Sequence, residues 1–415
     1  MDTNAPASSD LGLLRYVADR NGVATGYWDW YGNWIDVSAE SLLEVLRALG
    51  VPVSPESTVG DLREAARLVD EREWRQTLPP TIVARQGGGY EFPVHVPDGA
   101  WVAVQWILED GRNGHCEQLD RYVPPRTIDD RLVGRATFDV PHWLPLGWHR
   151  LVATVEGGLV ASSTLIIVPS SLDAPALRGG RRAWGVGAQM YSTRSHASWG
   201  IGDAVDLADL AAITADKGAD FLLINPVHAP QPISPQENSP YLPVSRRWLN
   251  PIYIRPEAIA EYAALPQESR DAIEQLRAQT VDFAVDEDLI DRDRVWEAKR
   301  KALEIVFAAA RPYRRQSDFD HFIERGGADL ANYALWCALV EREETIELPE
   351  ALSRSSAPAV EMERLEVSDR VEFWQWCQWI VSQQLGEAQA CARRVGMSMG
   401  IMADLAVGVH SRGSE

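Results

Sequence analysis

The fold is decided by a stretch that runs Gln189-Met190-Tyr191-Ser192, then Ser198-Trp199-Gly200-Ile201-Gly202-Asp203, then Phe221-Leu222-Leu223-Ile224, and finally Asn238-Ser239-Pro240-Tyr241. The third segment is apolar, and the second is rich in glycine. This order predicts a strand, a glycine-rich loop, a helix, a second strand and a long loop. A strand, helix and strand in succession indicate a βαβ crossover, which belongs to an α/β fold.

The segment after the glycine-rich loop has the signals of a helix. Asp203 is a residue type that caps helix N-termini, and Gly218 stands where a C-terminal glycine is expected. The run 219–225 that follows is apolar without alternation, which is typical of a parallel strand buried on both faces. We expect one side of the helix to be apolar through Val205, Leu207, Leu210, Ala211 and Ile213.

The unusual residues of this region lie in the loops after its strands. Trp199 follows the first strand, and Asn225, His228, Ser239 and Tyr241 follow the second. In a parallel barrel, the reacting groups gather at the C-terminal ends of the strands. We therefore expect the functional site on this side of the sheet.

The same loops carry a resemblance to a known family. Residues 198–203, residues 238–241 and the later Asn250-Pro251 resemble amylomaltase, the 4-α-glucanotransferase of glycoside hydrolase family 77, in its long actinobacterial form. The resemblance covers essentially the whole chain, and the order and spacing of the motifs make it specific. One departure is visible, because many relatives have Leu-Pro-Leu-Gly where this chain has Asn225-Pro226-Val227-His228.

Length and charge limit the class of protein. A chain of 415 residues, 46% of them hydrophobic, is long enough for two or three domains. A net charge of -20 argues against a nucleic-acid partner, which requires a basic surface. No apolar run approaches the ~18 residues of a membrane span, and the N-terminus does not read as a signal peptide. We expect a cytoplasmic protein that binds neither nucleic acid nor membranes.

Cysteine, histidine and glycine patterns give no sign of a metal or a cofactor. The four cysteines lack CxxC spacing and are interpreted as reduced thiols. The eight histidines lack HxH and HExxH spacing. Gly185 and Gly187 do not make a dinucleotide loop, because the third glycine is missing and the pair lies within a strand. We expect no metal and no cofactor.

Changes in periodicity divide the chain into three predicted domains. Residues 1–78 have helical spacing and predict a small helical domain. Residues 79–169 alternate with a period of two in several short strands, which predicts an immunoglobulin-like β-sandwich. Residues 181–415 are expected to form the first part of a TIM (β/α)8 barrel, with a helical insertion over about 253–396.

Many of the 16 tryptophans fall into two groups, at 28–34 and at 374–379. Aromatic faces can bind sugar rings, but clustered tryptophans at helical spacing are commonly part of a core. We expect both groups to be core, with the loop at 28–34 packing two helices together. Sugar binding by that loop stays open as an alternative.

The segment Asp318-Phe319-Asp320-His321-Phe322 superficially resembles the nucleophile motif of the family, Arg-Ile-Asp-His-Phe. Helix-forming residues surround it, and it precedes the third predicted strand. We therefore assign it to the helical insertion.

The third strand is expected at Gly400–Val407, with Asp404 at its C-terminal end. In the family a Gly-Asp-Leu-Pro segment occurs here, and its Asp faces the sugar. In this chain Ala403 and Ala406 replace the flanking Gly and Pro. The resemblance implies a substrate-binding role for Asp404. The alternative is that Asp404 caps the segment that follows the strand.

Two loop residues complete the expected substrate-binding set. The resemblance implies that Tyr241 stacks on a sugar ring and that Ser239 forms a hydrogen bond nearby. The alternative for Tyr241 is an anchor that packs beside Pro240.

The expected catalytic residues are absent from this sequence. Three predicted barrel strands precede Glu415, whereas a (β/α)8 barrel needs about 250 residues before insertions. The chain therefore resembles an N-terminal fragment. The family's Asp nucleophile, Glu acid/base and a third Asp come from later strands, so none is expected before Glu415.

The resemblance implies a function for the complete protein. It would transfer α-1,4-glucan segments to glucose or maltooligosaccharide acceptors by a retaining mechanism, in which one carboxylate attacks and a second, ~5 Å away, protonates the leaving oxygen. Two alternatives stay open. One is a non-catalytic α-glucan-binding protein, and the other is an α-glucan hydrolase, which differs only in its acceptor.

Overall fold

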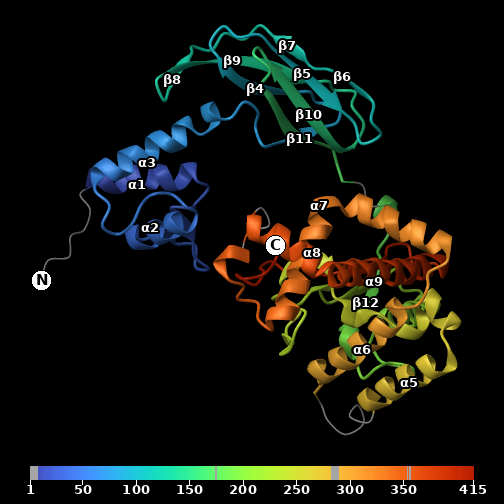
Figure 1. Ribbon diagram of the computed structural model, residues 1–415. Coiled ribbons are helices and arrows are strands. Elements are labelled where there is room, and N and C mark those ends of the chain that lie inside the picture. The colour runs from blue at the N-terminus through green and yellow to red at the C-terminus, as the bar shows by residue number, and fades with distance from the viewer. Residues whose placement is uncertain (1–7, 173–174, 282–288, 353, 355–356) are drawn as a thin grey trace, which may run out of the picture. The chain divides into compact units, whose positions relative to one another are not determined.

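The computed structural model describes residues 8–172, 175–281, 289–352, 354 and 357–415 (Figure 1). The chain divides into two compact units, Met1–Asp173 and Ala174–Glu415. The first unit contains two separate hydrophobic cores, one among helices and one between sheets, and the second unit contains one.

Three helices and a small hairpin form the first part of the first unit. Ser38 caps the second helix by accepting a hydrogen bond from the Ser41 N–H at 3.2 Å. Thr58 and Asp61 cap the third helix reciprocally. Residues such as Leu14, Leu42 and Leu62 fill the core between the helices. The elements are α1 (Ser8–Arg20), β1 (Gly26–Trp28), β2 (Trp34–Asp36), α2 (Ala39–Ala48), α3 (Val59–Glu71) and the 3-10 turn η1 (Glu73–Arg75).

The rest of the first unit is a β-sandwich. One sheet has the order β3-β11-β10-β5-β6, and the other has the order β4-β9-β7 with β8 also paired to β9. Alternate residues such as Phe92, Val94 and Leu151 point into the core, so the period of two in the sequence corresponds to real strands. The strands are β3 (Thr81–Arg85), β4 (Tyr90–Pro97), β5 (Val102–Ile107), β6 (Asn113–His115), β7 (Glu117–Leu119), β8 (Arg126–Ile128), β9 (Arg131–Val140), β10 (Gly147–Val155) and β11 (Val160–Val168).

A parallel sheet of three strands organises the second unit. Its order is β12-β13-β16, with β12 at Gly185–Ala188, β13 at Phe221–Ile224 and β16 at Gly400–Ala403. Helix α4 (Ala204–Asp216) connects the first two strands and packs on β13, as the sequence predicts. Leu207 and Ala211, which were expected on the apolar side of α4, are buried. Ile213 is exposed, so the expectation that it also lies on this side was wrong.

Only one face of the central strand is covered. Leu222 and Ile224 are buried against the helices, whereas Leu223 on the opposite face is 41% exposed. Met402 on the neighbouring strand β16 is also 41% exposed. The expectation that β13 is buried on both faces is therefore wrong for this chain. An apolar face of a parallel sheet lies open here.

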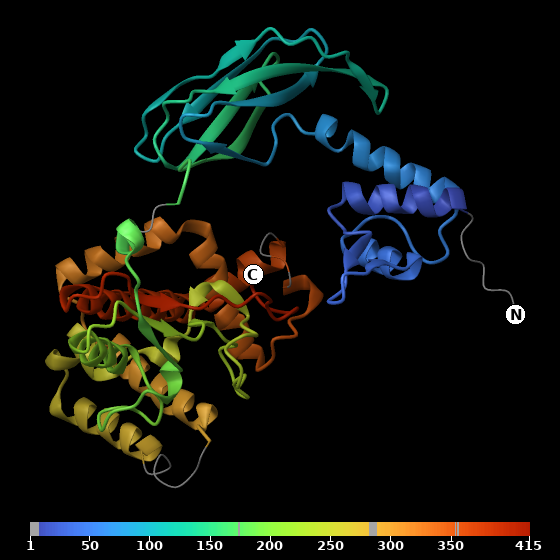
Figure 2. The ribbon, with the colours of Figure 1, turned by 180° about the vertical axis from the view of Figure 1, so that it is seen from behind.

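Helices fill most of the chain between β13 and β16 (Figures 1 and 2). The last of them, α9, packs against α4 and β16 and so completes the second crossover. The elements are β14 (His228–Ala229), β15 (Ser245–Leu249), the 3-10 turns η4 (Pro251–Tyr253), η5 (Pro256–Ala258), η6 (Ala260–Ala264) and η7 (Glu350–Leu352), and the helices α5 (Gln267–Val281), α6 (Arg292–Phe307), α7 (Tyr313–Glu343), α8 (Pro358–Glu366) and α9 (Ser368–Arg394). Two further 3-10 segments, η2 (Pro175–Gly180) and η3 (Met190–Ser192), flank β12.

Tryptophans of α9 form a large part of the core, which confirms the expectation for residues 374–379 (Trp374, Trp376 and Trp379 are all buried). The assignment of Asp320 to a helix is also confirmed, because Asp320 lies within α7 and accepts a hydrogen bond from Gln316 at 2.8 Å.

The aromatic hairpin does not pack two helices together. Trp28, Trp30 and Trp34 are all exposed, and Trp30 at the turn is 96% exposed. The core of the helical part contains none of them. The expectation that this group is core was therefore wrong.

Neighbouring leucines of β13 provide a test of the one-sided sheet. We expect Leu222→Ala to lower the free energy of unfolding of the 415-residue chain by about 2–5 kcal/mol, because it opens a cavity in a closed core. Leu223→Ala removes the same atoms from the open face and should cost about 1 kcal/mol or less. Urea unfolding of both variants measures the difference, and equal costs would contradict the open face.

Candidate functional site

The carboxyl ends of β12 and β13 are joined by Asn225, which directly follows β13. Its side-chain oxygen accepts a hydrogen bond from the Met190 N–H at 2.7 Å, and its side-chain NH2 lies 3.3 Å from Tyr253 Oη. Asn225 is almost completely buried. The side chain is therefore occupied in holding the loops, although the sequence suggested it among the candidates for the site.

The glycine-rich loop after β12 is shaped by close approach. A Cβ atom at Gly202 would collide with the carbonyl oxygens of Met190 and Thr193, so only glycine fits. Trp199 is fully buried, and its indole N–H lies 3.1 Å from both carboxylate oxygens of Glu257. Trp199 thus anchors the loop to η5 and is not available to a ligand.

A buried cluster of charges fixes the start of α4. Asp203 caps the helix through the N–H groups of Val205 and Asp206, at 3.0 and 3.3 Å. The guanidinium of Arg255, 52 positions further along the chain, pairs with Asp203 and lies 3.0 Å from the carboxylate of Asp206. Burial by itself would lower the pKa of Arg255, but its hydrogen bond to Asp203 and the two negative charges raise it. Arg255 therefore stays charged and binds η4 and η5 to the glycine-rich loop.

Lys299 of α6 reaches the same region from the other side. It is fully buried, and its Nζ donates to the carbonyl oxygens of Ile252 and Ile254 at 2.6 and 2.9 Å. Burial lowers the pKa of Lys299 from 10.5 to about 8. The ammonium group thus holds the backbone next to Arg255 in place.

Two of the three expected substrate-binding residues are in direct contact. Tyr241 Oη donates to Asp404 Oδ2 at 2.8 Å, although the two residues are 163 positions apart. Both side chains are exposed to solvent. The hydrogen bond to Asp404 raises the pKa of Tyr241, so its hydroxyl stays protonated at neutral pH. The tyrosine and the carboxylate therefore form a single exposed unit at the strand ends.

Further hydrogen bonds hold both members of this pair. Asp404 Oδ1 accepts the Leu405 N–H at 2.9 Å, and the Asp404 N–H donates to the carbonyl of Ile224 at 2.9 Å. Ser239 Oγ accepts the Tyr241 N–H at 3.3 Å. Ser239 thus lies beside the pair and shapes the loop through this hydrogen bond to Tyr241.

Two further residues lie near this loop, and the sequence analysis singles out only one of them, His228. Arg292 of α6 lies over the ring of Tyr191 at 4.8 Å and donates to Asn238 at 3.3 Å. His228 accepts the Ala406 N–H at 3.4 Å, and burial lowers its pKa. The sequence analysis names His228 among the unusual loop residues, whereas the sequence contains no local signal that Arg292 would reach the loop from 54 positions away.

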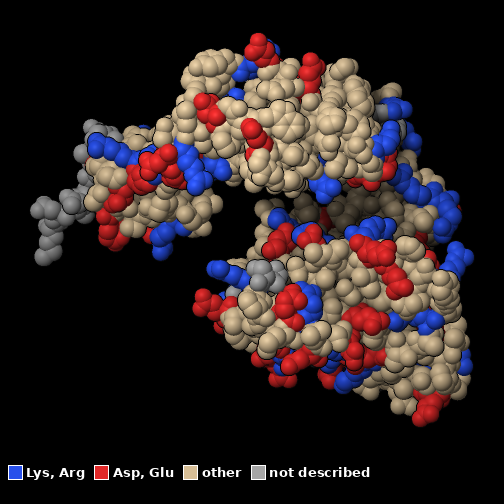
Figure 3. Space-filling view, turned by 45° about the horizontal axis from the view of Figure 1, so that its top comes forward, with Lys and Arg blue, Asp and Glu red and all other residues tan. Residues whose placement is uncertain are grey.

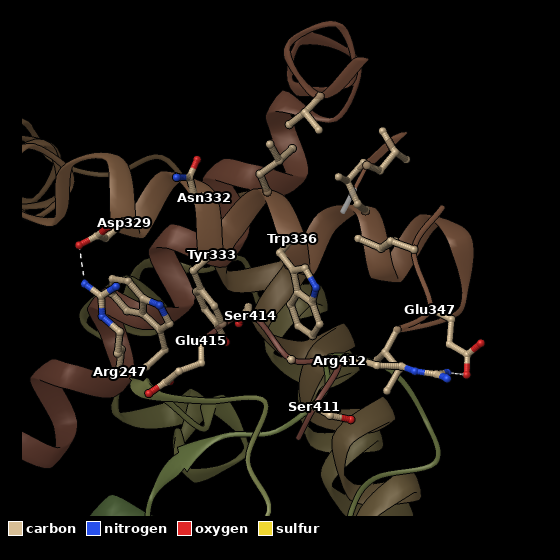
Figure 4. A pocket seen from close by; sticks show the side chains of 18 residues that line it. Arg247, Asp329, Asn332, Tyr333, Trp336, Glu347, Ser411, Arg412, Ser414 and Glu415 are labelled. Atoms are coloured by element: carbon tan, nitrogen blue, oxygen red, sulfur yellow. Dashed lines mark hydrogen bonds and ion pairs between the residues drawn. The ribbon is translucent and has the colours of Figure 1, made fainter. Parts of the chain in front are cut away.

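Two cavities of very different size bear on where a ligand could bind. Ser239 lines a cavity of about 30 Å³ together with Tyr191 and Arg292, which is too small for a sugar ring. A second cavity of about 700 Å³ lies between β15, α7 and residues 411–415, with the ion pairs Arg247–Asp329 and Arg412–Glu347 at its sides (Figure 4). Neither Tyr241 nor Asp404 lines this larger cavity. A ligand of the Tyr241–Asp404 pair would therefore bind on its exposed surface.

Three further observations concern nucleic-acid, metal and membrane binding. Acidic and basic side chains are interspersed on the face that Figure 3 shows, without a continuous basic surface. Within the described ranges, no group of three or more His, Cys, Asp and Glu side chains is arranged to hold a metal ion. Among the same residues, no helix combines the length and the apolar character required to cross a membrane.

Comparison with known proteins identifies the family. The model of the family described as 4-alpha-glucanotransferase (glycoside hydrolase family 77) matches residues 188–415. The chain belongs to this family. The model of the MalQ N-terminal beta sandwich domain matches residues 77–169, where the two sheets of the β-sandwich lie. The family resemblance noted in the glycine-rich loop and the 238–241 segment is therefore confirmed.

Individual relatives agree over most of the chain. It is 43% identical over 409 residues to a 4-alpha-glucanotransferase of Mycobacterium tuberculosis, covering 96% of this chain and 56% of that protein. It is 30% identical to a 4-alpha-glucanotransferase of Haemophilus influenzae, covering 97% of this chain and 55% of that protein. The crystal structure of the amylomaltase from Corynebacterium glutamicum superimposes with a TM-score of 0.86 at 40% identity, covering 97% of this chain and 56% of that one.

These alignments show an amylomaltase-like fold with an N-terminal β-sandwich. The chain spans little more than half the length of the curated relatives it matches.

The protonation of Lys299 gives a testable pH dependence. Its pKa is about 8 in the folded chain and 10.5 as the reference value, so between these values the unfolded chain holds a proton that the folded chain lacks. The stability gained from this group is complete above pH 10.5 and is lost as the pH falls towards 8. Relative to Lys299→Met, the wild-type free energy of unfolding should rise by about 3 kcal/mol across this range.

Urea unfolding of both proteins at several pH values from 7.5 to 10.5 measures this difference. Lys301→Met is the matched control, because Lys301 lies on the same helix and is exposed. Parallel stability curves for the wild type and Lys299→Met would contradict the lowered pKa.

Proposed function

We propose that the protein containing this chain transfers segments of α-1,4-glucan to glucose or maltooligosaccharide acceptors, by a retaining double displacement. The observation that carries this proposal is the family match over residues 188–415, which includes the loops of Tyr241 and Asp404. Three residues of this chain would bind substrate, namely Ser239, Tyr241 and Asp404. No metal or cofactor is part of the proposal.

The parallel sheet supports a barrel as the catalytic domain. We propose that β12, β13 and β16 are the first three strands of a (β/α)8 barrel, with α4 and α9 on its outside. All three strands are parallel, and the face opposite the helices exposes Leu223 and Met402. In a closed barrel this face would be the interior, which is filled by side chains. The N-terminal sandwich would be of the immunoglobulin type, preceded by a separate helical domain.

The Tyr241–Asp404 pair suggests how a sugar would be bound. The Tyr241 ring would stack on the apolar face of one glucose unit, since its hydroxyl is already occupied by Asp404. An ionised carboxylate has about four acceptor positions, so Asp404 retains capacity for a sugar hydroxyl beside its bonds to Tyr241 and Leu405. Ser239 would position the loop and contribute a hydroxyl at its edge.

The bond-breaking carboxylates would come from another part of the protein. A retaining mechanism needs a nucleophilic carboxylate and an acid/base ~5 Å from it. We propose that both lie in the part of the relatives that this chain does not cover, beyond Glu415. Asp320 is not a candidate, because it lies on α7 and binds Gln316. A glucan-binding protein without turnover is the alternative for the 415-residue chain by itself.

Maltotriose provides the direct test, in a protein extended to the length of its relatives. We expect glucose and longer maltodextrins, and Asp404→Asn should lower kcat/KM ten- to a hundredfold, because it loses a charge-assisted contact of about 1.5–3 kcal/mol. Tyr241→Ala should lower it by a factor of about ten through lost stacking, whereas Tyr241→Phe retains the ring and should cost less. Time courses of product formation, followed by chromatography, measure these values.

The melting temperature of each variant separates substrate binding from a structural cap. Asp404→Asn should leave it nearly unchanged, since Asp404 is exposed. A large fall in melting temperature with normal turnover would remove Asp404 from the site. The 415-residue chain is the negative control. Maltotriose turnover by that chain, abolished by Asp320→Asn, would overturn the placement of the catalytic carboxylates.

A further inference from the structure

The β1–β2 hairpin of the first unit exposes an unusual number of aromatic rings. Tyr27, Trp28, Trp30, Tyr31 and Trp34 are between 51% and 96% exposed. Exposed aromatic surface of this kind marks an interaction site, because water disfavours it. We call these five residues the aromatic hairpin.

The hairpin is rigid at its turn. The Asp29 carboxylate accepts the N–H groups of Tyr31 and Asn33, both at 2.8 Å, and the side-chain NH2 of Asn33 at 3.1 Å. The Asp29 N–H donates to the Asn33 carbonyl at 2.8 Å. Trp30 and Tyr31 thus stand on a turn that is closed by hydrogen bonds on both sides.

The ring of Trp34 is also held in one position. Its Nε1–H donates to Asp36 Oδ1 at 3.0 Å, and Asp36 in turn forms an ion pair with Arg15 at 3.0 Å. A Cβ atom at Gly26 would overlap the indole ring, so the ring lies directly on the glycine backbone of β1. The indole ring is thereby prevented from collapsing onto the helices.

Two tryptophans on one face of the hairpin form an angled platform. Trp28 and Trp34 are cross-strand partners, and their ring centroids lie 5.4 Å apart at an interplanar angle of 71°. Flat ligands stack on a single plane. A chain of pyranose rings joined by α-1,4 bonds is curved, so that successive rings turn relative to each other and can contact two surfaces at an angle.

The charges around the hairpin are already paired, which selects for a neutral ligand. The bonds from Asn33 lower the pKa of Asp29, with the backbone N–H contributing most. Trp34 and then Arg15 lower the pKa of Asp36. Both carboxylates therefore remain ionised and occupied. The exposed surface that is left consists of ring faces, an indole N–H and tyrosine hydroxyls, which match the CH faces and hydroxyls of a neutral sugar.

We propose that the aromatic hairpin binds an α-1,4-glucan chain, as a second glucan site on the N-terminal unit. The choice of α-1,4-glucan as the ligand rests on the proposed function. The location of the site rests on the exposed, fixed and uncharged aromatic rings. It would hold a long glucan independently of the Tyr241–Asp404 pair. Short substrates such as maltotriose would gain little from it.

Affinity electrophoresis of the 415-residue chain in gels with and without glycogen tests the site. Tyr241→Ala is introduced into every protein, so that the strand-end loop contributes little to retardation. We expect Trp28→Ala and Trp34→Ala each to weaken glycogen binding about tenfold or more, since a central stacking ring is lost. Trp30→Ala is the third hairpin variant. Trp30 lies at the exposed turn and outside the core, so its loss should not affect folding.

Trp101→Ala is the matched control, because Trp101 is also exposed but lies in the β-sandwich, outside the hairpin. It should leave retardation unchanged. Unchanged retardation in all three hairpin variants would overturn the proposal. Sedimentation velocity gives a second way to overturn it. If the chain with an intact hairpin is a dimer and the hairpin variants are monomers, a second copy of the chain is the occupant of the hairpin.

The outcome is separable from that of the proposed function. Maltotriose transfer by the longer protein should remain within about twofold in Trp28→Ala, whereas transfer from glycogen should fall with its binding. Loss of glycogen binding without any maltotriose transfer would support the hairpin site and contradict the transferase. Maltotriose transfer together with unchanged glycogen binding in the hairpin variants would support the transferase and overturn the hairpin site.

Discussion

The second unit depends on one buried arginine between two buried aspartates. Arg255 forms ion pairs with both Asp203 and Asp206, and Asp203 at the same time caps α4. Removing one partner of such a group leaves an uncompensated buried charge, which costs about 3–5 kcal/mol. The glycine-rich loop, the first crossover helix and the segment after Asn250 are therefore held together by these ion pairs and the helix cap.

The exposed pair at the strand ends is a consequence of this framework. Asn225 joins the ends of β12 and β13, and the Asp404 N–H binds the carbonyl of Ile224 at the end of β13. Tyr241 then needs a single hydrogen bond to be fixed against Asp404. A stacking ring is useful for a flexible sugar only when it is held in place beforehand, because ordering it on binding would cost affinity.

Local signals in the sequence predicted the elements but not the long-range contacts. The Asp203 cap and the helical setting of Asp320 depend on neighbouring residues, and both were predicted correctly. The exposure of Trp28 was predicted wrongly, because burial depends on whether another element covers a ring. Partners 50 or more positions apart, such as Asp203 and Arg255, leave no local pattern.

The buried charge cluster is tested most directly by a double-mutant cycle. Hydrogen exchange of the α4 amides reports the free energy of opening of the second unit, in Asp203→Asn, Arg255→Met and the double variant. The account predicts that Arg255→Met costs about 3–5 kcal/mol, because it leaves the buried Asp203 and Asp206 carboxylates without their arginine. The double change should cost at least about 1.5 kcal/mol less than the sum of the single changes, because Asp203 is then no longer a buried charge without its partner. Costs that simply add would show that Asp203 and Arg255 act independently, and would contradict the framework described for this unit.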